Sequence, residues 1–141
     1  MKLPQLSVFL ENRPGSLAEP LKLLAAAGIN LVSISLADTE QFGILRLVLK
    51  EWERAKAALE QDGWVANVSD VVAVDVDDQP GGLVHMLGVL AEAGINIEYM
   101  YAFALRRNYK AVLLFRFEDP DAAIEVLKAA NIGIVQEADM Y

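Results

Sequence analysis

The stretch PGSLAEPLKLLAAAGIN, from Pro14 to Asn30, recurs as PGGLVHMLGVLAEAGIN from Pro80 to Asn96. Ten of the seventeen aligned positions are identical, and the two stretches are 66 residues apart. Self-similarity at a fixed offset indicates that one structural unit is repeated. We therefore expect the chain of 141 residues to consist of two copies, residues 3–69 and residues 70–141.

The order of elements in each copy follows from its hydrophobic pattern. A half-buried strand with apolar residues at every second position is expected at 6–10 and 72–76, directly before each Pro-Gly turn. Leucines then recur at helical spacing until Gly28 or Gly94, and glycine tolerates the left-handed backbone that ends many helices. Two strands, a second helix and a short fourth strand follow, expected at 30–37, 43–50, 51–61 and 64–68, and again at 96–104, 110–117, 119–130 and 132–136.

This order, β-α-β-β-α-β in each copy, is that of the ferredoxin-like unit. The predicted fold class is therefore α+β, with two such units in tandem. In the second strand of the first copy, Val32, Ile34 and Leu36 form the apolar face that we expect to meet the helices.

Composition excludes several classes of function. The chain has 12 Lys and Arg against 20 Asp and Glu, a net charge of −8, which argues against a nucleic-acid partner because phosphate binding needs clustered cations. It has no cysteine and a single histidine, His85, which is expected on the surface, so neither a metal site nor a cofactor is predicted. No apolar run approaches the roughly 20 residues of a membrane span. A cytoplasmic location is expected.

The Pro-Gly turns have the chemistry of an amino-acid site. The first amides of a helix lack internal partners and, with the helix dipole, favour a carboxylate. We expect such amides at Gly15, Ser16 and Leu17, and at Gly81, Gly82 and Leu83. The preceding Asn12 or Asp78 offers a side-chain oxygen to an ammonium group. A zwitterionic amino acid needs both features, whereas the sequence offers no catalytic set of residues.

The turns Glu11–Leu17 and Asp77–Leu83, each followed by a helix and Gly-Ile-Asn, resemble those of tandem ACT-domain proteins over nearly the whole chain. The resemblance implies a regulatory module that binds a free amino acid between two paired domains and acts on a metabolic enzyme. Carried over by motif position, one site joins Asn12, Gly15, Ser16 and Leu17 to Asn96, with Arg13 beside them. The other joins Asp78, Gly81, Gly82 and Leu83 to Asn30.

Pairing of residues 31–36 with residues 97–102 would give one eight-stranded antiparallel sheet with the helices on one face and both sites at its centre. The other face is expected to be apolar and to pack against another copy, giving a homodimer or higher homo-oligomer. Its expected members are Phe9, Ile44, Val48, Tyr99, Tyr101, Val112 and Leu114. We expect the Asn12 site to bind more tightly, because Asp77 and Asp78 repel a carboxylate.

Other interpretations remain open at this point. In the first of these, the Pro-Gly turns only start a helix, and Asn30 and Asn96 only cap the local backbone, with no role in binding. An adaptor without a ligand would use the apolar sheet face. A small enzyme on this fold would use Arg13, and an RNA-binding module would need basic and aromatic residues on strands that are here aliphatic.

Overall fold

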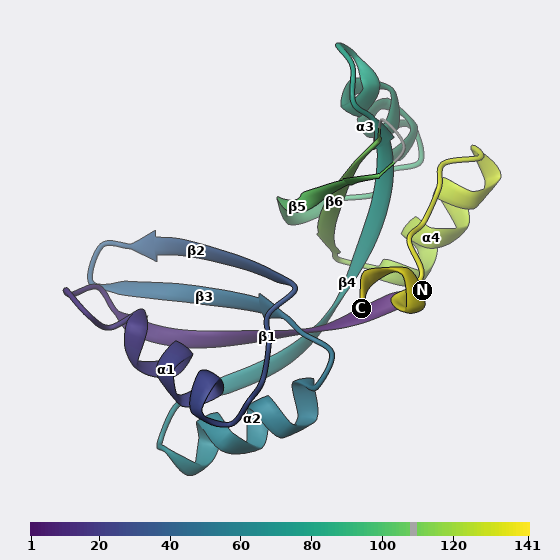
Figure 1. Ribbon diagram of the computed structural model, residues 1–141. Helices are drawn as coiled ribbons and strands as arrows, with labels where there is room; N and C mark the ends of the chain where they lie inside the picture. The colour runs from purple at the N-terminus through teal and green to yellow at the C-terminus, as the bar shows by residue number, and fades with distance from the viewer. Residues whose placement is uncertain (108–109) are drawn as a thin grey trace. The chain divides into compact units, whose positions relative to one another are not determined.

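The computed structural model describes residues 1–107 and 110–141 (Figure 1). Its internal contacts divide the chain into two compact units. The N-terminal unit comprises Pro4–Ser69 and Tyr141, and the C-terminal unit comprises Asp70–Met140 and Met1–Leu3. Among the described residues, no helix combines the length and the apolar character needed to cross a lipid bilayer. The cytoplasmic location stays a prediction.

The N-terminal unit is a sheet with two helices. It contains most of β1 (Lys2–Glu11), then α1 (Ala18–Ala26), β2 (Ser33–Thr39), β3 (Phe42–Val48), α2 (Trp52–Gln61) and the first residues of β4 (Ala66–Asp77). Strand β3 pairs antiparallel with both β1 and β2, so the order is β2-β3-β1-β4. Helices α1 and α2 lie on the same face of this sheet (Figure 1).

The C-terminal unit repeats this plan. It contains the rest of β4, α3 (Gly82–Glu92), β5 (Ile97–Arg107), β6 (Lys110–Phe117), α4 (Pro120–Ala129) and the short α5 (Glu137–Met140). Strand β6 pairs antiparallel with β4 and with β5, and α3 contacts α4. The α+β class and the ferredoxin-like units are confirmed.

Each unit has its own apolar core, built from alternate strand residues and one stripe of each helix. In the N-terminal unit, Leu6 and Val8 of β1 pack with Leu24 of α1 and Leu59 of α2. The C-terminal core has the equivalent composition, with Val72, Val74, Met86, Leu90 and Leu127. Full burial of such a side chain stabilises the fold by about 1.5–3 kcal/mol. These cores fix where each strand ends and where the turn after it begins.

The predicted number of strands is wrong, since the described residues form six strands instead of eight. The expected strands at 64–68 and 72–76 are a single strand, β4, because Ser69 and Asp70 adopt extended backbone and do not interrupt it. The expected strand at 132–136 makes only an isolated bridge between Ile134 and Val74.

The predicted pairing of residues 31–36 with residues 97–102 within the chain is also wrong. The hydrogen-bonded neighbour of β2 is β3 and that of β5 is β6 in the described strand order. Strands β2 and β5 are the two edges of that order, so each has a single hydrogen-bonded neighbour and neither pairs with the other.

The apolar surface differs from the expected one. Val48, Val112 and Leu114 are completely buried in the single chain, so the predicted apolar sheet face is not exposed at these positions. Ile34 and Leu36, expected in the core, are 44% and 52% exposed. The reason is that β2 is an edge strand, and the N-terminal core contains residues of β1 and β3 but none of β2.

The cap of α4 provides a test of the fold. The Asp119 carboxylate accepts a hydrogen bond of 3.1 Å from the Ala122 amide. Removing this acceptor in Asp119→Ala should lower the free energy of unfolding by about 1 kcal/mol. Asp119→Asn keeps a side-chain acceptor and should stay near the original value. Urea denaturation of both variants measures this, and an equal loss in the two would contradict the capping role.

Candidate ligand-binding site

The two Pro-Gly loops have the same backbone conformation. Gly15 and Gly81 have φ angles of +84° and +87°, which L side chains rarely adopt. The Ser16 amide donates to the Arg13 carbonyl at 3.2 Å, and the Gly82 amide donates to the Gln79 carbonyl at 3.1 Å. The prediction that the Ser16 and Gly82 amides lack an internal partner is therefore wrong, because in each turn the amide donates to a carbonyl of the same turn.

The helices after the two loops begin at different positions. Helix α1 starts at Ala18, whereas α3 starts at Gly82, two residues earlier in the aligned repeat. A Cβ atom added at Gly82 would lie 2.1 Å from the carbonyl oxygen of Asp77, so only glycine fits there. The first copy carries Ser16 at this position. The second loop is thus held closer to the end of its strand.

Asn12 and Ser16 support the first loop. The Asn12 side-chain amide donates to the carbonyl of Glu40 at 2.8 Å, and its backbone amide donates to Gln41 at 2.9 Å. These bonds tie the loop to the hairpin between β2 and β3. The Ser16 hydroxyl, which is buried, donates to the Arg13 carbonyl at 3.0 Å. The side-chain oxygen of Asn12 is the atom that suits an ammonium group.

Arg13 is held by two carboxylates. Its guanidinium donates to Glu19 at 3.2 Å and to Glu11 at 3.1 Å. The hydrogen bond with Glu19, and to a smaller extent that with Glu11, raises the pKa of Arg13 above its ordinary value. The positive charge of this loop is therefore compensated beside it, so Arg13 attracts a ligand carboxylate less strongly than an unpaired cation would.

The second loop borders a cavity of about 420 Å³. Predicted residues Asp78 and Leu83 line it, together with Val76, Asp77, Gln79, Pro80, Ala111 and Leu113. Ligand pockets commonly enclose about 300–1,000 Å³ and combine apolar walls with a few polar groups. The sequence prediction missed the apolar wall from β4 and β6, although the strand alternation of Val76 and Leu113 contains that signal.

Asn30 lines a second cavity, of about 430 Å³, in the N-terminal unit. Its other lining residues are Val32, Lys50, Glu51 and Tyr141. Lys50 and Glu51 place a cation and a carboxylate beside Asn30, and the motif prediction did not include them. Asn96, the matching residue of the second copy, is exposed and directly precedes β5. The joining of each loop to the asparagine of the other copy stays a prediction.

The described residues include no group of three or more His, Asp or Glu side chains that could hold a metal ion. His85 is exposed on α3, as expected.

Comparison with known proteins identifies the family. The family model described as an ACT domain pair matches residues 1–141. The chain belongs to this family. Protein BT0572 from Bacteroides thetaiotaomicron is 38% identical, with a TM-score of 0.92 over 100% of this chain and 96% of that one. No protein in a search of curated sequences matches.

Two regulatory subunits share the fold of this ACT domain pair at lower identity. The regulatory subunit of aspartate kinase from Thermus thermophilus is 20% identical, with a TM-score of 0.65 over 90% of this chain and 91% of that one. The subunit from Thermus flavus is 22% identical, with a TM-score of 0.63 over 91% and 92%.

The close approach at Gly82 predicts a large difference between two glycines of α3. Gly82→Ala should destabilise the protein by about 1–3 kcal/mol, because the new methyl group meets the backbone of Asp77. Gly88→Ala has open space around its Cβ and should stabilise by about 0.5–1 kcal/mol through helix propensity. Thermal unfolding of both variants measures the contrast. Equal effects would contradict the tight second loop.

Proposed function

We propose that this ACT domain pair is a non-catalytic regulatory module that binds a free amino acid at its Pro-Gly loops. The observation that carries the proposal is the cavity beside the second loop, which combines carboxylates with an apolar wall. Asp77 or Asp78 is suited to the ammonium group of the ligand, and Leu83 and Leu113 to its side chain. The start of α3, eleven residues long, adds the positive end of a helix dipole for the carboxylate.

The two loops are proposed to bind with different affinities. The first loop has Arg13, compensated by Glu11 and Glu19, whereas the second has Asp77 and Asp78. Our sequence-based preference for the Asn12 loop stays a prediction, and the cavity beside the second loop makes that loop a strong competitor. By the motif, the complete first site would also include Asn96, and the complete second site would also include Asn30.

The regulated partner is proposed to be a metabolic enzyme on another chain. Structural neighbours of this fold include regulatory subunits of aspartate kinase and the aspartokinase alpha and beta subunits. A ligand regulates only if it binds two conformations of the module with different affinity. An amino acid at the loops would favour one arrangement of the module and so change its effect on the enzyme.

A catalytic role has less support. The only residue that suggested it, Arg13, is held in ion pairs with Glu11 and Glu19.

We also propose that copies of the chain associate through the β2–β3 hairpin. Ile34 and Leu36 of the edge strand β2 are 44% and 52% exposed and lie on one face of the hairpin. Exposed apolar groups on an edge strand favour pairing with another chain. This replaces the sheet face, much of which is buried, as the proposed surface of association.

Leu36→Glu should reduce the mass measured by sedimentation to that of a single chain, because it places a charge in the apolar contact. Val84→Glu is the matched control, since Val84 is 70% exposed and belongs to α3 instead of the hairpin. Association that survives Leu36→Glu, or that is lost equally in Val84→Glu, would contradict this surface.

Thermal unfolding in the presence of each of the twenty amino acids tests the binding function. A ligand that binds only the folded state at one hundred times its Kd raises stability by about 2.7 kcal/mol. One amino acid, or a few of similar structure, should raise the Tm by several degrees.

The raised Tm should be lost in Asn12→Ala or in Asn96→Ala if the first site dominates, and in Asp78→Ala or Asn30→Ala if the second does. Glu92→Ala, an exposed change at the end of α3, should leave the shift unaltered. No shift with any amino acid would favour the adaptor interpretation and contradict the proposal.

A further inference from the structure

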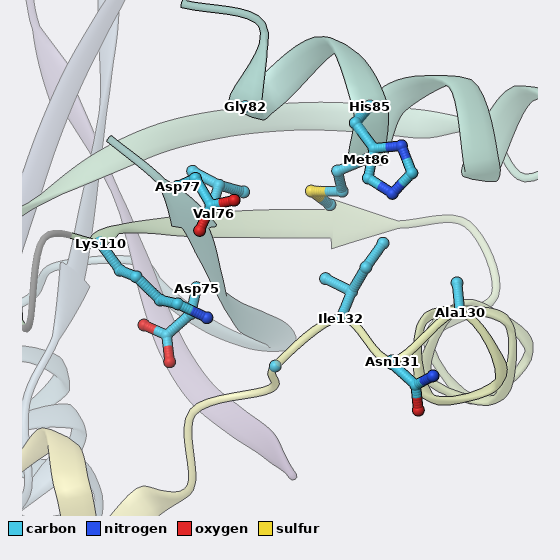
Figure 2. Close-up of a pocket in the computed structure, with 11 residues that line it drawn as sticks. Asp75, Val76, Asp77, Gly82, His85, Met86, Lys110, Ala130, Asn131 and Ile132 are labelled. Carbon is cyan, nitrogen blue, oxygen red and sulfur yellow. The ribbon is translucent and has the colours of Figure 1, made fainter. Parts of the chain in front are cut away.

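The C-terminal unit contains another cavity, which borders the second Pro-Gly loop at Asp77 and Gly82 and has a volume of about 190 Å³ (Figure 2). It lies between β4 and the segment that follows α4, at a place that we call the charged fork and define by Asp75, Lys110 and Gly133. The Asp75 amide donates to the Gly133 carbonyl and the Val135 amide donates to the Ala73 carbonyl, both at 2.9 Å, which holds residues 133–135 beside β4. Asn131, with a left-handed φ of +58°, belongs to the turn by which the chain leaves α4.

Three elements surround this fork. Strand β4 contributes Asp75 and Asp77, the start of β6 contributes Lys110, and α3 contributes Gly82, His85 and Met86. In Figure 2, Asp75, Asp77 and Lys110 gather at one side, and His85 and Met86 project from α3. The cavity therefore has a side with two carboxylates and an ammonium group, and a side with the imidazole of His85 and the thioether of Met86.

Asp75 carries an unusual oxygen atom. Its Oδ1 is buried and has no hydrogen-bond partner among the described residues. Leaving a buried acceptor without a donor is costly, and more so for a charged group. Lys110, which pairs along the strands with Asp77, forms no ion pair in the part of the chain that the structure describes.

The first copy shows that the fold does not require these groups. The bond from the Phe9 amide to the Val65 carbonyl, at 3.4 Å, corresponds to that from Asp75 to Gly133. Phe42, the last strand partner of Glu11, corresponds to Lys110, the last partner of Asp77. Where the second copy has a carboxylate, a cation and a glycine, the first therefore has two phenylalanines and a valine.

We propose that this cavity binds the primary ammonium group of a small molecule, with the ammonium donating to Oδ2 of Asp75, the oxygen that lies 3.6 Å from a Cβ atom built on Gly133. Two carboxylates against one lysine leave an excess of negative charge around the cavity. A cavity of about 150 Å³ holds a molecule of the size of benzene, so the ligand has only a few non-hydrogen atoms besides the nitrogen. The cavity shares Asp77 and Gly82 with the second Pro-Gly loop, but Asp75 lies outside the residues assigned to that loop, so the proposal does not depend on the function proposed for the loops.

The probe is ethylamine hydrochloride, titrated into the full chain labelled with ¹⁵N at neutral pH. The amides of Asp75 and Gly133 should shift in a saturable manner. Tetramethylammonium chloride at the same concentration carries the charge without N–H donors and should produce no saturable shift. A parallel titration with glycine distinguishes amines from amino acids. If an amino acid is the ligand, Lys110→Met weakens glycine binding and leaves ethylamine binding intact.

Three variants complete the experiment. Asp75→Asn should weaken ethylamine binding at least tenfold while preserving the spectrum elsewhere. Gly133→Val copies Val65 of the first copy, fills the cavity without changing a charge, and should abolish binding. Asp121→Asn, an exposed carboxylate on α4, is the control and should bind as the original chain does.

The proposal is overturned by any of three results: no saturable shift in the original chain, equal shifts with tetramethylammonium, or undiminished binding in Asp75→Asn. If Gly133→Val does not fold, the isosteric Asp75→Asn decides alone. The loop variant Asp78→Ala, which alters the cavity beside the second loop and not this one, should leave ethylamine binding unchanged, so failure here is separable from failure of the loop site.

Discussion

The left-handed glycine of each strand-to-helix turn is the constraint on which the rest of this structure depends. Gly15 and Gly81, with φ near +85°, reverse the chain within a few residues of the first strand of each repeat. That reversal brings the following helix back over the sheet, where Leu24 or Leu90 enters the core. The same reversal leaves the loop's polar residues at the end of the strand, where a ligand can approach them.

The two copies therefore share one fold but differ in the side chains around their loops. In the first, Asn12 and Arg13 are engaged with Glu40, Glu11 and Glu19. The second loop has a tighter start at Gly82 and a cavity beside it. The charged fork around Asp75 also belongs to the second copy alone, since Phe9 stands at the equivalent strand position. Because the shared core fixes the backbone, substitutions outside it change the chemistry without changing the fold.

Much of the fold followed from the repeat. The spacing from Pro-Gly to Gly-Ile-Asn predicted the turn, the helix and its glycine end, and Gly28 and Gly94 indeed have φ of +71°. Period-two alternation found the core residues of β1, β3 and β4. It failed for Ile34 and Leu36, because alternation states which face a residue occupies and not whether a helix covers that face.

The candidate site was less predictable. The motif identified Asp78 and Leu83, but Ala111 and Leu113 come from a strand about 30 residues later and join the loop only through β-sheet pairing. Ser16 and Gly82 were expected to offer amides, and the turn uses both internally. The charged fork was missed because Asp75, Lys110 and Gly133 are far apart in sequence and each is unremarkable on its own.

The central claim is that the Pro-Gly loops receive an amino acid. The most direct test is the ¹H–¹⁵N spectrum of the full chain, recorded with a mixture of the twenty amino acids at millimolar concentration and then with each component. The account predicts saturable shifts for the loop amides, Gly15 or Gly81 and the residues after them, with one amino acid or one structural class. Saturable shifts confined to other parts of the chain, or none at all, would contradict it.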